Sequence, residues 1–180
     1  MLNPARIPFF QLVCAALLFG IGVGAQTPPP ASLAPVPAAL LNAKTVFISN
    51  AGADSGLFPH PFSGDPDRAY NEFYAGMQSW GRYQIVADPS AADVVFELRL
   101  IAPYGPSNPN KQNGAADPLP MFRLVILDRK SHYVLWALTE SVEFAFLQKT
   151  HDNNFDAALW AITMDLKRLT SAPTSTTANH

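Results

Sequence analysis

The sequence predicts an α+β fold in which a single mixed β-sheet of about five strands carries two amphipathic helices on one face. Apolar residues make up 48% of the 180 residues and charged residues 14%, a composition that can build a core. Several short apolar runs have the alternation or β-branching of strands, and two longer segments repeat apolar residues every three to four positions, as helices do. Their order, β-α-β-β-β-β-α, favours both helices on the same side of one sheet.

The first strand and the first helix are separated by a loop rich in glycine and proline. The strand covers residues 44–49 (KTVFIS), and the loop covers residues 50–65. A helix is expected to begin near Asp65 or Pro66, because proline is favoured in the first helical turn, and Gly81 is expected to end it. Its predicted core face consists of Tyr70, Phe73, Met77 and Trp80.

Two strand-like runs then flank an Asp-Pro-Ser-Ala-Ala-Asp connector. The runs cover residues 83–87 and 93–101. Pro89 bars Asp88 from a helical conformation, and the carboxylates of Asp88 and Asp93 can accept backbone N–H groups, as in Asx turns and caps. The connector is therefore interpreted as a structural turn.

The strand over residues 93–101 alternates apolar and polar side chains, so one of its faces is expected to be buried and the other partly wet. Glu97 and Arg99 lie on the wetter face, where they can pair. An exposed pair of this kind contributes about 0–1 kcal/mol. Residues 102–118, which follow, are interpreted as a long polar loop.

The last part of the domain is predicted to be a hairpin followed by a helix. Strands are expected over residues 121–127 and 132–139, with the second strand continuing through Val142 and Phe144. A cap at Asp152 or Asn153 is expected to start the helix. Its apolar stripe consists of Phe155, Leu159, Ile162, Leu166 and Leu169.

The first 25 residues resemble a signal peptide. Arg6 provides a positive charge, an uncharged apolar run follows, and Val-Gly-Ala ending at Ala25 is a small-residue cleavage site. The alternative is an uncleaved membrane anchor, although the apolar run is slightly short for a span of about 20 residues. Cys14, the sole cysteine, falls within this segment. We therefore expect a periplasmic or secreted mature chain without thiol chemistry.

The remaining boundaries follow from composition. Residues 26–41 are rich in proline and alanine and are expected to be an extended linker. Residues 42–170 are expected to form the single α+β domain. Residues 171–180, rich in Ser, Thr and Ala, are expected to be a disordered tail.

Two segments resemble a known group of small bacterial envelope domains. In the first, Ala91-Ala92-Asp93 leads into a strand. In the second, LVILDRKSHYVLWALTE, residues 124–140, reads as strand, Asp128, turn and a strand that holds Trp136. This arrangement resembles the TolB amino-terminal domain, curli-assembly lipoproteins and DUF4136-like lipoproteins. The resemblance covers roughly residues 44–170, without a lipobox, and implies a non-catalytic envelope protein that binds other proteins or cell-wall components.

The residues themselves give no pattern for catalysis or for a cofactor. The net charge of −2 argues against nucleic acid as a partner. The sequence has no HExxH motif, nucleophile elbow or P-loop, so no catalytic, metal or cofactor-binding residue is assigned. A site that joins His60, His151 and a carboxylate to hold a metal ion stays open. One alternative function is a small secreted hydrolase with a loop-borne carboxylate or His site. A membrane-anchored structural protein is the other alternative.

The proposed binding residues are Phe58, His60 and Phe62, which lie in the first glycine- and proline-rich loop. The two phenylalanines can either fold back over the sheet or project as a binding patch. The sequence therefore predicts an exported binding or assembly module whose partner is an unidentified envelope protein or cell-wall component.

Overall fold

The computed structural model describes residues 34–171. The expected signal peptide, residues 26–33 of the expected linker and residues 172–180 of the expected tail lie outside these described residues. Within residues 34–171, no helix combines the length and the apolar character that a membrane span needs.

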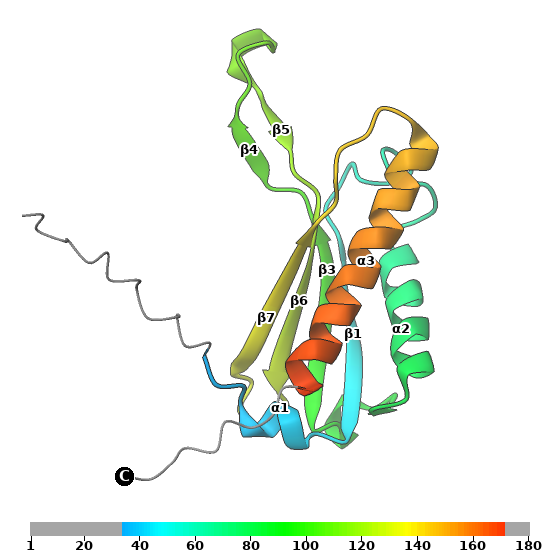
Figure 1. The fold of residues 1–180 in the computed structure, drawn as a ribbon, viewed down its shortest axis with the longest axis vertical. Coiled ribbons are helices and arrows are strands. Elements are labelled where there is room, and N and C mark those ends of the chain that lie inside the picture. Colours follow the sequence, from blue (N-terminus) through cyan, green and yellow to red (C-terminus); the bar gives the residue numbers. More distant parts are fainter. Residues whose placement is uncertain (1–33, 172–180) are drawn as a thin grey trace, which may run out of the picture. The chain divides into compact units, whose positions relative to one another are not determined.

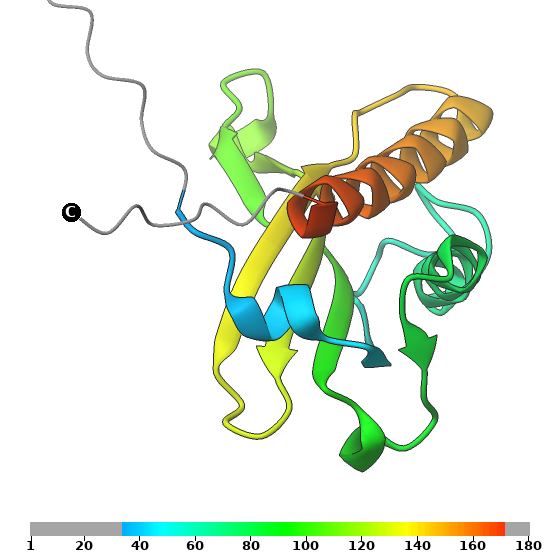
Figure 2. The ribbon, with the colours of Figure 1, turned by 60° about the horizontal axis from the view of Figure 1, so that its bottom comes forward.

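A five-stranded mixed sheet forms the centre of the fold, in the order β2-β1-β3-β6-β7 (Figures 1 and 2). Strand β1 (Thr45–Ala53) pairs in parallel with β2 (Gln84–Ile85) and with β3 (Val94–Ile101). Strand β3 pairs antiparallel with β6 (Met121–Asp128), which pairs antiparallel with β7 (Val134–Ser141). The predicted mixed sheet is confirmed.

Two long helices, α2 (Arg68–Trp80) and α3 (Gln148–Ser171), cover the same face of this sheet (Figures 1 and 2). Their buried side chains include Phe73 and Met77 on α2 and Phe155 on α3. The predicted α+β arrangement is therefore confirmed.

Alternation along the strands decides which side chains reach the helices. On β3 the buried positions are Val94, Phe96, Leu98 and Leu100, while the residues between them face away from the helices. Phe122 on β6 meets Phe155 on α3 edge to face, with 4.9 Å between ring centroids. Each such fully buried large side chain contributes roughly 1.5–3 kcal/mol, so this layer is the main source of stability.

Helix α2 ends as expected and begins slightly later than expected. Gly81 adopts the left-handed conformation at φ 67° and donates its N–H to Met77 O at 3.2 Å. At the other end, Asp65 holds a turn before the helix, since its carboxylate accepts the N–H of Asp67 and its carbonyl accepts that of Arg68. This turn moves the first helical residue to Arg68.

The Asp-Pro-Ser-Ala-Ala-Asp connector is a structural turn, as predicted. It contains a short 3₁₀ helix (Pro89–Ala91), and Asp88 accepts the backbone N–H of Ser90 at 2.8 Å. Asp93 accepts the N–H groups of Lys44 at 2.9 Å and Thr45 at 3.0 Å. These backbone hydrogen bonds lower the pKa of Asp93, and they fix the start of β1 beside β3. Strand β2 is shorter than the expected strand over residues 83–87.

The region expected to be a loop, residues 102–118, contains a two-stranded antiparallel ribbon. Strands β4 (Tyr104–Ser107) and β5 (Ala116–Pro118) pair with each other, and a 3₁₀ turn (Gln112–Gly114) lies between them. Side chains close the ribbon: Asn108 donates to the Asp117 carboxylate at 2.8 Å, and Lys111 forms an ion pair with the same carboxylate. The expectation of a loop throughout residues 102–118 is wrong, because these local contacts leave no periodic signal.

Two further boundaries differ from those expected. A short helix, α1 (Ala38–Asn42), crosses the boundary between the expected linker and the expected domain, and its Leu40 is fully buried. Helix α3 begins at Gln148, so Asp152 and Asn153 lie inside it. Asp152 turns toward the neighbouring loop and does not cap the helix.

Candidate functional site

Three segments meet at one end of the sheet: the loop over residues 54–64, the β4–β5 ribbon and the connection over residues 142–147. Figure 1 shows the ribbon and the connection together above the strands. The two are joined where Val142 donates its N–H to Pro120 O at 2.8 Å. Large exposed apolar side chains gather on these segments, and we call this set the apolar end; it consists of Tyr104, Leu119, Phe144, Phe146 and Leu147.

The connection over residues 142–147 presents the most exposed of these side chains. Phe146 is 93% exposed and Phe144 is 75% exposed, and their rings meet edge to face at 5.2 Å. Phe144 also packs against the ring of His151 on α3 at 5.6 Å. Val142 and Ala145 are buried and anchor the segment. The chain therefore holds two aromatic rings in solvent on a fixed base. Strand β7 ends at Ser141, so the expected continuation through Phe144 is wrong.

The sequence-proposed residues Phe58, His60 and Phe62 lie in the neighbouring loop but do not act as one patch. Phe62 is 1% exposed and its ring lies 5.2 Å from that of Phe155. Phe58 is half-buried against the same two rings. Both phenylalanines therefore fold back over the core, which was the first of the two alternatives. His60 is the exposed member, and its Nδ1 lies 3.2 Å from Gln148 Oε1.

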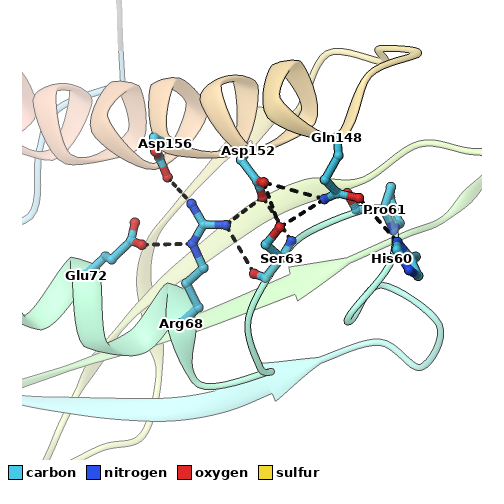
Figure 3. A network of polar contacts seen from close by, with 8 residues as sticks. All are labelled: His60, Pro61, Ser63, Arg68, Glu72, Gln148, Asp152 and Asp156. Atoms are coloured by element: carbon cyan, nitrogen blue, oxygen red, sulfur yellow. Dashed lines mark hydrogen bonds and ion pairs between the residues drawn. The ribbon is translucent and has the colours of Figure 1, made fainter.

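Arg68 joins this loop to both helices (Figure 3). Its guanidinium donates to Glu72 on α2 at 2.8 Å, and to Asp152 at 2.8 Å and Asp156 at 2.5 Å on α3. The same group lies over the Phe155 ring, 4.3 Å from its centroid. Its side chain is only 17% exposed, so its positive charge is partly desolvated. The three carboxylates compensate that charge.

Asp152 completes the connection to the loop. It accepts the backbone N–H of Ser63 at 2.9 Å and the hydroxyl of Ser63 at 2.8 Å, and Gln148 donates to it at 3.5 Å. Desolvation opposes ionisation, but the hydrogen bonds from Ser63, Arg68 and Gln148 outweigh it and lower the pKa of Asp152 to about 2. A carboxylate held this firmly in its charged form is a poor general acid or base near neutral pH. We call this network of Ser63, Arg68, Gln148 and Asp152 the clamp, and its role is structural.

A broad hollow of about 690 Å³ lies between the loop and the ribbon and is lined by Asp54, Arg99 and Tyr104, among others. Arg99 pairs with Asp54 at 2.9 Å, so the expected pairing of Arg99 with Glu97 is wrong. The loop that follows β1 brings Asp54 to Arg99. Asp54 also accepts the N–H of Ala102 at 2.9 Å. This backbone hydrogen bond, with a weaker contribution from Arg99, lowers the pKa of Asp54.

A second, smaller hollow of about 110 Å³ lies beside the exposed rings. Its apolar lining includes Phe62, Val142, Phe144 and His151, together with three prolines. Among residues 34–171, no group of three or more His, Cys, Asp or Glu side chains is arranged to hold a metal ion. The features that this end of the molecule offers are thus apolar surface and shallow hollows.

No protein-family model matches the chain, and no curated protein does. Similar solved structures include a PelC dodecamer from Paraburkholderia phytofirmans, which is 13% identical with a TM-score of 0.47 and covers 78% of this chain and 96% of that chain. Protein XCC0632 from Xanthomonas campestris is 15% identical, with a TM-score of 0.43 and coverage of 78% and 86%.

Uncharacterized lipoprotein B from Nitrosomonas europaea is 12% identical, with a TM-score of 0.35 and coverage of 71% and 81%. Lipoproteins are therefore among the solved structures to which this chain is similar. The narrower resemblance to the TolB, curli-assembly and DUF4136-like groups stays a prediction.

Proposed function

We propose that this protein is an exported, non-catalytic module of the bacterial envelope that binds another protein or a cell-wall component through its apolar end. The observation that carries the proposal is the exposure of Phe144 and Phe146, at 75% and 93%. The two rings meet at 5.2 Å, and exposed apolar surface that exceeds single scattered side chains marks interaction surfaces on folded domains. Aromatic side chains, phenylalanine included, are also enriched in the cores of protein–protein interfaces.

The base of this surface supports a role in binding. Val142 and Ala145 are buried on either side of Phe144, and the Phe144 ring rests on His151 of α3. Side chains that are already positioned lose less conformational entropy when a partner covers them. The apolar end is therefore partly preorganised.

Export and the absence of catalysis rest on other observations. The apolar run that ends at Ala25 supports cleavage of a signal peptide near that residue. The most strongly perturbed carboxylate among the described residues, Asp152, is held in a structural clamp. His60 Nδ1 lies 3.2 Å from Gln148 Oε1 at that clamp, and a glutamine amide does not titrate, so it does not serve as a partner acid or base.

A cross-linking pull-down tests the proposal. The tagged full chain and a Phe144→Ser, Phe146→Ser double variant are expressed in cells, cross-linked and purified, and the retained proteins are identified by mass spectrometry. Trp160→Ser is the matched control, because Trp160 is 64% exposed but lies on α3, outside the apolar end. We expect specific envelope partners with the wild-type chain and the control, and their loss with the double variant.

A second arm tests a cell-wall component directly, by co-sedimentation of each purified chain with isolated cell-wall sacculi. Binding that the double variant loses and the Trp160 variant keeps supports the proposal. The proposal fails if neither arm shows binding above background, or if the double variant binds as well as the wild-type chain.

A further inference from the structure

The two edges of the sheet are unequal. At one edge, β2 contains two residues, Gln84–Ile85, which is too short to pair stably with another chain. At the other edge, β7 contains eight residues, Val134–Ser141, and within residues 34–171 its strand partner is β6 alone. A long edge strand presents unpaired N–H and C=O groups, which are a template for a further strand.

Strand β7 also lacks most of the features that keep edge strands from pairing. Proteins protect such edges with proline, lysine, short strands or bulges, but β7 reads VLWALTES, with neither proline nor lysine. An irregularity in its pairing with β6 lies near its start, between Val134 and Trp136, and the pairing from Trp136 to Ser141 is regular. The protection is therefore confined to one end of the strand.

The charge distribution of β7 allows an identical strand to pair with it. Glu140 is the single charged residue of β7, and it interacts with Asp165 on α3, on the helix side of the sheet. An antiparallel copy of β7 brings two Glu140 side chains opposite each other only if the symmetry axis passes through that residue. Like charges directly opposite each other destabilise a strand pair. At every other register the two strands avoid such a pair.

We propose that β7 pairs antiparallel with β7 of a second copy of this chain, so that the two sheets join into one across a two-fold axis. An axis at Leu138 places Ala137 of one copy opposite Thr139 of the other on the face without helices. Both side chains are small and exposed, so they leave room for the second strand. Tyr133 and Val134, exposed by 75% and 59% at the start of β7, add apolar contact area to this isologous interface.

The interface is separate from the apolar end, so each proposal can fail without the other. The direct test is sedimentation velocity of the full chain over a range of concentrations, for the wild-type chain and an Ala137→Lys, Thr139→Lys variant. We expect a concentration-dependent dimer that the two lysines abolish, because they place like charges across the seam, while the Phe144→Ser, Phe146→Ser variant still dimerises. A wild-type chain that stays monomeric, or a dimer that survives both lysines, overturns the proposal.

A cysteine variant tests the geometry without depending on how well the lysine variant folds. In a Cys14→Ser background, Thr139→Cys places one thiol on β7, and Gln78→Cys places one on the exposed face of α2 as a matched control. A short bismaleimide cross-linker, which spans the roughly 7–8 Å between diagonal residues of paired strands, should yield a linked dimer for Thr139→Cys at several times the extent seen for Gln78→Cys. Equal cross-linking overturns the proposal, and so does cross-linking of Thr139→Cys in cells to a different protein alone, which would assign this edge to another chain's strand.

Discussion

Arg68 on α2 and Asp152 on α3 form an ion pair, with 2.8 Å between Nη1 and Oδ1, that links the two helices to the loop carrying Ser63. Asp152 is 22% exposed at its side chain, so solvent screens this pair less than a surface pair. The two residues lie 84 positions apart in the chain. Their contact is therefore a long-range constraint that no local sequence pattern contains.

Replacement of Asp152 by Asn should lower the free energy of unfolding at pH 7 by on the order of 2 kcal/mol, which is the linkage equivalent of its pKa shift. The folded pKa, about 2, lies below the ordinary value of 3.8. This stabilisation is thus present above about pH 4 and is lost as the pH falls toward 2. Urea unfolding between pH 2 and pH 7 measures both effects.

The matched control for Asp152 is Glu72→Gln. Glu72 binds the same guanidinium, but its side chain is 41% exposed and lies one helical turn away, so its removal should cost about 0.5 kcal/mol or less. Equal losses for Asp152→Asn and Glu72→Gln would contradict the description of Asp152 as the principal anchor of the clamp.

Substitution of the loop residues Phe62 and His60 should change the free energy of unfolding by very different amounts. Phe62→Ala removes a ring that is 1% exposed and should lower the free energy of unfolding by about 3–5 kcal/mol. His60→Ala removes an exposed side chain and should change it by about 0.5 kcal/mol or less. Thermal and urea unfolding of both variants test this. A small effect of Phe62→Ala would mean that the ring lies outside the core.

Gly76 inside helix α2 and Gly81 just after its last residue provide a pair of substitutions with opposite signs. Gly81 has φ 67°, and no atom lies near the position of an added Cβ. Gly81→Ala therefore incurs only the cost of the left-handed backbone, about 1 kcal/mol. Gly76 lies inside the helix with equal space around it, so Gly76→Ala should stabilise the protein by about 0.5–1 kcal/mol. Urea unfolding compares the two, and a destabilising Gly76→Ala would contradict the helical environment described for it.

Sequence patterns located the elements that regular periodicity specifies. The order of the main strands, the apolar faces of both long helices and the end of α2 at Gly81 all follow from alternation, helical spacing or the conformational freedom of glycine. The turn at Asp88 and Asp93 was also predictable, because these side chains satisfy backbone groups close to a strand end.

The apolar end could not be located in this way. Val142, Phe144 and Phe146 alternate like a strand, and alternation alone does not tell which residues face the core. In the folded chain the strand stops at Ser141, and Phe144 and Phe146 face solvent. The burial of Leu40 was missed for a related reason, since the surrounding proline-rich composition conceals a single core residue.

Glu140 on β7 should be one of the few carboxylates whose replacement stabilises the protein. Desolvation, followed by the neighbouring Asp165 carboxylate, raises the pKa of Glu140 above its ordinary value of 4.5. The unfolded chain therefore ionises at a lower pH than the folded chain, and the contribution of Glu140 to stability falls as the pH rises from about 4.5 through the folded pKa. Glu140→Gln should remove this pH-dependent loss of stability, because the amide stays uncharged.

At pH 7 Glu140→Gln should raise the free energy of unfolding by about 0.5–1 kcal/mol, and the gain should shrink below pH 4.5, where the unfolded carboxyl is also protonated. Urea unfolding at pH 7 and pH 4 measures the difference, and Glu143→Gln is the control, since Glu143 is exposed at the start of the next segment. A variant that is less stable than the wild-type chain at pH 7 would show that the Glu140 carboxylate has a net favourable partner. Arg168 on α3 is the candidate, because its charge lowers the pKa of Glu140.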